Sequence, residues 1–163
     1  MGTKHPLIHA LLAAFALVAL VGSGCGGSGG ENAEADQPGV PKIVYIQKGD
    51  RICQANYAKR TQLLTRLSKK YEDGKNLPPQ ARQEEIVVKQ IMPIFWEESE
   101  ELNDLALPKE GAKEAEQILA ELEKSIEGVE ADPARSLSEG TGVEFKGTER
   151  LAHEYGFKWC GRS

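Results

Sequence analysis

Apolar residues recur at helical spacing through most of the chain after residue 50. Between 51 and 73 they are separated by three, four or seven positions, and they are Cys53, Tyr57, Leu64, Leu67 and Tyr71. Asp50 precedes this segment as a candidate N-cap, so we expect a first helix over 51–73 that ends near Gly74. The apolar run 43–46 has no second strand to pair with, and we expect it to form an extended arm packed on the helices.

A second helix is expected after Pro78 and Pro79, which are suited to its first turn. Its apolar stripe contains Val88, Met92, Phe95, Leu102 and Ala106, and is widened by Ile91 and Ile94. Pro93 lies inside this stripe. Because proline removes a backbone hydrogen bond and clashes with the preceding turn, we expect a kink near 89–93 in one helix rather than two separate helices.

Two further helices complete the pattern. The third is expected over 111–130, with an apolar face made of Ala115, Ile118, Leu122, Ile126 and Val129. Asp132 and Pro133 then favour a short helical turn. A last helix is expected over 145–155, and Gly156 is placed to end it in a left-handed conformation. Four amphipathic helices without a sheet-forming pattern predict an all-α fold, a small bundle of about four helices.

The first 41 residues follow a different pattern. Lys4 is followed by an apolar run over 7–21, and the small residues 22–24 then precede Cys25. The run is shorter than the roughly 20 apolar residues that span a bilayer. This order resembles a bacterial lipoprotein signal sequence with its lipobox. The resemblance implies that a lipid is attached to Cys25 and that the chain is cut just before it; the small residues at 22 and 24 also suit an ordinary signal peptidase and simple secretion.

The chain is therefore expected to contain a signal peptide over 1–24, a lipid-anchored flexible tether over 25–41 and a helical extracytoplasmic domain over 42–163. The expected location is the cell membrane, facing outside the cytoplasm. Cleavage removes Lys4 and no acidic residue, which leaves 19 Lys and Arg against 25 Asp and Glu, a net charge of −6. This balance disfavours nucleic acid as a partner, and it disfavours electrostatic attachment to anionic headgroups.

Once Cys25 is assigned to lipid, Cys53 and Cys160 form an even pair in an oxidising compartment. We expect a disulfide between them that closes the bundle. A redox-active or metal-binding pair is the alternative, but the two residues lack CxxC spacing and neighbouring histidines.

Several segments of the domain resemble a family of small exported proteins and lipoproteins of high-GC Gram-positive bacteria. The resemblance spans nearly all of the mature domain, and it is carried by 52–53, 91–93, 105–108, 131–133, 151–157 and 160–161. It supports the fold, the disulfide and the location. The family has no assigned activity, so the resemblance leaves the function open.

Candidate chemistry is sparse. His153, with Glu149 and Glu154 nearby, has too few neighbouring ligands for a metal site and is expected at the surface or a helix end. The acidic run of Glu97, Glu98, Glu100, Glu101 and Asp104 is expected to be a solvated helix face rather than a calcium site. The Gly-x-Ser-x-Gly match at 26–30 lies in a glycine-rich segment and follows no predicted strand, so it is not a nucleophile elbow, and no GxxxxGK[ST] phosphate-binding loop occurs. We therefore expect no enzyme activity, no cofactor and no metal.

The most informative surface candidates are two tryptophans and the neighbouring acids, and the possible partner surface comprises Trp96, Glu97, Glu100, Glu101 and Trp159. The preferred interpretation is an envelope interaction or structural module, held at the membrane through the lipid on Cys25, with an envelope protein as partner. The alternative is a small-ligand-binding or metal-binding lipoprotein with a pocket between the kinked helix and the C-terminal helix.

Overall fold

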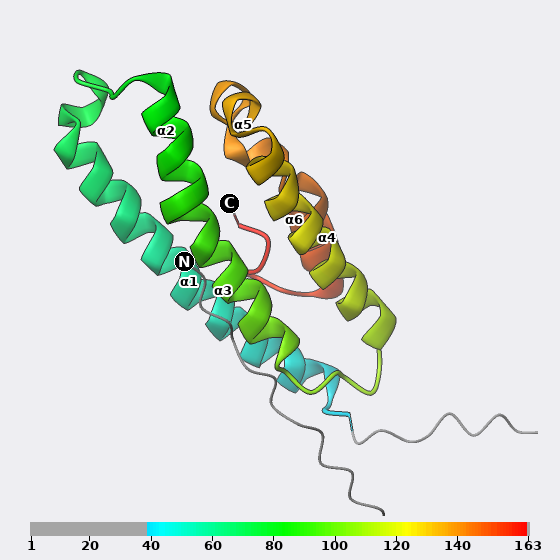
Figure 1. The fold of residues 1–163 in the computed structure, drawn as a ribbon. Coiled ribbons are helices and arrows are strands. Elements are labelled where there is room, and N and C mark those ends of the chain that lie inside the picture. The colour runs from blue at the N-terminus through cyan, green and yellow to red at the C-terminus, as the bar shows by residue number, and fades with distance from the viewer. Residues whose placement is uncertain (1–38, 163) are drawn as a thin grey trace, which may run out of the picture. The chain divides into compact units, whose positions relative to one another are not determined.

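The computed structural model describes residues 39–162, which form an all-α bundle (Figure 1). Helix α1 spans Lys42–Lys70 and begins directly after Pro41. The predicted extended arm at 43–46 is therefore wrong, because this segment forms the first turn of α1. Tyr45 lies on the same buried face as Gly49 and Cys53, at four-residue intervals, so the helical stripe starts earlier than local sequence suggested.

The second helical run is continuous from residue 80 to residue 103. It consists of α2 (Gln80–Ile86), the π-helical turn η2 (Val87–Ile91) and α3 (Met92–Asn103). We expected a kink near 89–93 in one continuous helix; the structure has a π-turn over Val87–Ile91, and Pro93 lies in the first turn of α3. A π-turn adds one residue to a helical turn. The wider turn makes room for the proline ring at a position where the backbone has no N–H to donate.

The remaining elements are close to their predicted limits. Helix α4 spans Ala112–Ala131, α5 spans Pro133–Glu139 and α6 spans Lys146–Tyr155. The Asp132 carboxylate accepts the backbone N–H of Arg135 at 2.9 Å, as expected for an N-cap. Gly156 ends α6 with φ of 116°, in the predicted left-handed conformation. Short 3₁₀ turns, η1 (Glu72–Gly74) and η3 (Thr141–Val143), complete the connections.

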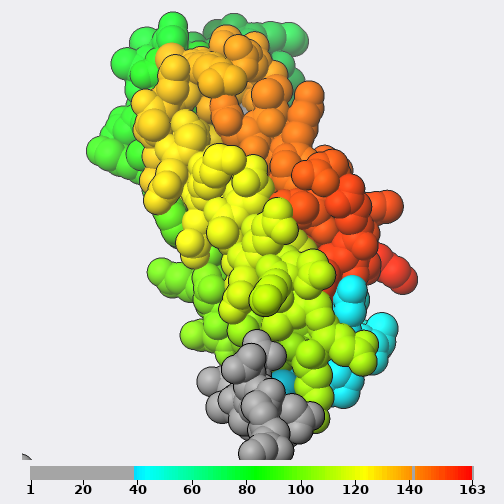
Figure 2. All heavy atoms as spheres, turned by 90° about the vertical axis from the view of Figure 1, so that its right-hand side faces the viewer, coloured from blue at the N-terminus to red at the C-terminus, as the bar shows by residue number. Residues whose placement is uncertain are grey.

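The helices pack in a simple order. In Figure 1, α3 lies between α1 and α4. Figure 2 shows α4 across one face of the molecule with α6 beside it. The core between these helices contains Tyr45, Met92, Phe95, Leu102, Ile118, Leu122, Ile126, Val129, Phe145 and Ala152. Phe95 and Phe145 stack there with ring centroids 4.4 Å apart, which joins α3 to the segment that leads into α6.

Only the first part of α1 contributes to this core. Its buried residues end at Arg60, and Leu64, predicted on the apolar face, is 51% exposed.

Over residues 39–162 no strand is formed, and the one isolated bridge pairs Val40 with Pro108. Within the same residues, no helix is both long and apolar enough to cross a membrane.

Candidate functional site

The segment 156–162, called here the C-terminal strap, folds back against the first half of α1. Gly156 turns the chain, and Phe157 is buried beside Tyr45 with ring centroids 5.9 Å apart. A Cβ atom on Gly49 would lie 2.6 Å from the Phe157 ring, too close for any other residue without a shift. Gly49 therefore lets the strap approach the α1 backbone.

Two further contacts fix the strap to α1. Cys53 and Cys160 form the predicted disulfide, with an S–S distance of 2.05 Å. Asp50 Oδ1 accepts the backbone N–H groups of Lys158 and Trp159, each at 2.9 Å. The prediction that Asp50 caps the first helix is wrong, since Asp50 lies inside α1 and binds backbone donors of the strap instead.

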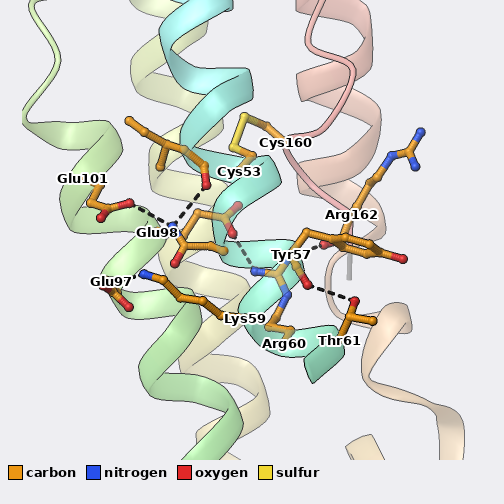
Figure 3. Close-up of polar contacts among 12 residues, drawn as sticks. Cys53, Tyr57, Lys59, Arg60, Thr61, Glu97, Glu98, Glu101, Cys160 and Arg162 are labelled. Atoms are coloured by element: carbon orange, nitrogen blue, oxygen red, sulfur yellow. Dashed lines mark hydrogen bonds and ion pairs between the residues drawn. A yellow bond between two sulfur atoms is a disulfide. The ribbon is translucent and has the colours of Figure 1, made fainter. Parts of the chain in front are cut away.

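Arg60 connects α1, α3 and the strap (Figure 3). Its Nη1 donates to Glu98 Oε2 at 2.5 Å, and its Nη2 donates to the carbonyl oxygen of Arg162 at 2.7 Å. The guanidinium carbon also lies 4.0 Å from the centroid of the Phe95 ring. Only 5% of the Arg60 side chain and 2% of the Glu98 side chain are exposed. The ion pair is thus enclosed where three parts of the chain meet.

Burial raises the pKa of Glu98, because the charged carboxylate loses its hydration. Arg60 opposes this rise and Glu101 adds to it. Glu98 was expected on a solvated acidic face, and the structure corrects this. It follows Phe95 by three residues on the buried side of α3, so the helical register was the signal that could have identified it. Arg60 likewise follows Cys53 by seven residues on the buried side of α1.

Two of the acids in the proposed partner surface contact side chains of α1. Glu97 forms an ion pair with Lys59 at 2.7 Å, and Glu101 accepts the side-chain amide of Asn56 at 2.9 Å. Glu100 is exposed. The structure therefore brings Glu97 and Glu101 together along the junction of α1 and α3.

The two tryptophans contact different elements. Trp96 is half-buried, and its Nε1 donates to Glu130 of α4 at 3.2 Å. Trp159 is half-buried in the strap, with its ring centroid 5.8 Å from that of Tyr57. Figure 3 shows Glu97 and Glu101 on one side of α1, and Arg162 of the strap on the other. The five candidate residues are thus distributed over more than one face.

Two hollows lie on α6 and its surroundings. The first, of about 480 Å³, is lined by His153, Gly156, Phe157, Lys158 and Arg162. The second, of about 320 Å³, is lined by Lys42, Glu114, Gln117, Leu151, Glu154 and Tyr155. The π-turn and α3 line neither hollow, in contrast to the expected pocket beside the kinked helix. Between residues 39 and 162 no three His, Cys, Asp or Glu side chains are grouped to hold a metal ion.

The fold and the strap define a class of structure, a helical bundle closed by one disulfide between its first helix and its C-terminal segment. Comparison with family models, curated proteins and solved structures finds no match to this chain.

The contribution of Asp50 is testable by two matched substitutions. Asp50→Ala is expected to lower the free energy of unfolding by about 1 to 2 kcal/mol, because two backbone donors of the strap lose their acceptor. Asp50→Asn keeps the side-chain oxygen and is expected to lose less than half of that. Urea unfolding of both variants measures the difference; equal losses would show that the acceptor is not what fixes the strap.

Proposed function

We propose that this chain is a bacterial membrane-anchored extracytoplasmic lipoprotein that acts as an interaction or structural module of the cell envelope. The observation that carries the proposal is the order of segments at the N-terminus, an apolar run over 7–21, then Cys25, then a polar segment to residue 41. A lipid on Cys25 holds such a chain at the membrane once the signal peptide is removed.

The disulfide supports an extracytoplasmic location, since disulfides form and persist in oxidising compartments. The polar segment before residue 39 supports a tethered domain, although the expected tether limit of 41 is too late, since Val40 already pairs with Pro108 in the domain. The glycine, serine and acidic residues of this segment are typical of a linker between a membrane anchor and a domain. The net charge of −6 for residues 25–163 favours protein or small-molecule partners over nucleic acid.

A binding or structural role is preferred to catalysis because of where the perturbed carboxyl group lies. Catalytic acids and bases with altered pKa values need access to a substrate. Glu98 is enclosed by Arg60 and α3 and lines neither hollow. Its raised pKa is therefore interpreted as a consequence of structural burial.

The anchor is tested by Cys25→Ala in a bacterial host. The unchanged chain is expected in the membrane fraction and resistant to extraction with high salt, whereas Cys25→Ala loses the lipid and is expected to lose that resistance. Ser28→Ala, in the polar segment, is the matched control and is expected to fractionate with the unchanged chain. Recovery of the unchanged chain as free protein in the medium would instead favour simple secretion.

The interaction role is tested by crosslinking in intact cells followed by purification. A recurrent envelope protein that copurifies with the chain is the expected result. Repeated recovery of the chain without any such partner would contradict an interaction module.

A small-ligand-binding lipoprotein is the second candidate, and the hollow beside the C-terminal strap is the observation that favours it.

A further inference from the structure

The hollow beside the C-terminal strap gathers nitrogen-bearing side chains in an otherwise acidic chain. His153 from the last turn of α6 and Lys158 and Arg162 from the strap all line it. All three residues are exposed. Across residues 39–162, no carboxylate forms an ion pair with any of them, whereas Lys59, Arg60 and Arg150 each have an acidic partner. The hollow therefore offers positive charge that the described protein does not neutralise.

The orientation of Arg162 suits an external acceptor. Its Nε donates to the carbonyl oxygen of Lys158 at 3.1 Å, and its guanidinium carbon lies 4.8 Å from the centroid of the Trp159 ring. These contacts position the group without using its two terminal nitrogens, which donate to no protein atom in the described part of the chain. A guanidinium held in this way can present two parallel N–H donors to a carboxylate or phosphate.

The strap that carries these cations is held in place before any ligand binds. The disulfide fixes Cys160, and the carbonyl of Arg162 accepts a hydrogen bond from buried Arg60. Asp50 Oδ1 accepts two backbone N–H groups of the strap, which holds Lys158 and Trp159 against α1. Because the backbone is already ordered, a ligand would restrict only the exposed side chains, which lowers the entropic cost of binding.

We propose that this hollow binds a small organic oxyanion, whose carboxylate or phosphate group lies between Lys158 and Arg162. An N–H of the His153 imidazole supplies a third donor. The hollow is a depression open to solvent, so recognition depends on its charged donors, with Phe157 among its lining residues.

Calorimetric titration of the purified full chain in nonionic detergent tests the site, with citrate and inorganic phosphate as probes at low ionic strength. Lys158→Gln/Arg162→Gln is expected to weaken binding at least tenfold, because both charged donors are removed. Lys69→Gln/Lys70→Gln removes the same charge from two exposed residues at the far end of α1, and is expected to bind within twofold of the unchanged chain.

Binding of citrate alone would identify a carboxylate site, and binding of phosphate alone a phosphate site; either supports the proposal. Absence of binding to both probes would overturn it. An equal loss in the two double variants would also overturn it, because binding would then follow net charge and not this hollow. The titration does not depend on the lipid at Cys25, so its failure and failure of the membrane anchor are distinguishable.

Discussion

Replacing both Cys53 and Cys160 with serine is expected to lower the free energy of unfolding by about 4 kcal/mol. The bond joins residues 107 positions apart, so its loss restores much of the conformational entropy of the unfolded chain. Removing the bond also removes the covalent link between the strap and α1, which lowers the free energy of unfolding further. Urea unfolding at neutral pH, monitored by far-UV circular dichroism, measures the change.

Reduction provides the matched control for the disulfide. Dithiothreitol is expected to destabilise the unchanged protein to about the level of Cys53→Ser/Cys160→Ser, and to leave that double variant unaffected. If the double variant unfolds at the same urea concentration as the oxidised protein, the disulfide does not hold the strap and the account of the closed bundle is wrong.

Arg60→Met is expected to produce the second large effect, a loss of about 3 to 5 kcal/mol, because it leaves the buried Glu98 carboxylate without its cation. Methionine retains apolar contact with Phe95, so the loss reports chiefly on charge and on the hydrogen bond to the Arg162 carbonyl. Arg60→Met/Glu98→Leu removes both charges and is expected to recover most of the stability. The double-mutant cycle is read from urea unfolding.

The deficit of Arg60→Met is also expected to depend on pH. Burial raises the pKa of Glu98, and removing Arg60 takes away the main influence that opposes this rise. The folded variant then binds a proton at a higher pH than the unfolded chain, so its stability increases as the pH falls through the folded-state pKa. The deficit should be largest at neutral pH and smaller near pH 4. A deficit that stays constant would exclude Glu98 as its source.

Local sequence was sufficient to predict a helix and its limits where the apolar stripe and the capping residues lie within or next to that helix. The apolar stripe of α4 is uninterrupted, and its predicted and observed limits differ by one residue. Asp132 before Pro133 and Gly156 after α6 act through neighbouring backbone groups, so their roles could be predicted without the fold. The disulfide was predictable from the number of cysteines, because the proposed assignment of Cys25 to lipid leaves one pair.

The errors arose where distant residues decide the local structure. Gly49 and Asp50 resemble a helix boundary, yet α1 continues through them. Phe157 packs on Gly49, and a backbone N–H of the strap donates to the Asp50 carboxylate. Their partners lie more than a hundred residues away in sequence. Glu98 was misassigned for a similar reason, since charge alone favours exposure and the buried cation that accommodates it comes from another helix.

The candidate sites were only partly accessible from sequence. Trp159 and the acids around Glu97 were selected by composition, but their contacts, Trp159 with Tyr57 and Glu97 with Lys59, depend on how the strap and α3 pack on α1. The hollow at His153, Lys158 and Arg162 has no sequence pattern of its own, because its shape depends on the disulfide and on the turn at Gly156. The role of Cys25, which lies outside the described residues, stays a prediction.

The most direct test of the central proposal is the intact mass of the chain isolated from bacterial membranes. A membrane-anchored, disulfide-closed lipoprotein predicts the mass of residues 25–163 plus a lipid, reduced by two hydrogens for the Cys53–Cys160 bond. A chain that begins at another residue and carries no lipid, or one that retains residues 1–24, would contradict the proposed anchor.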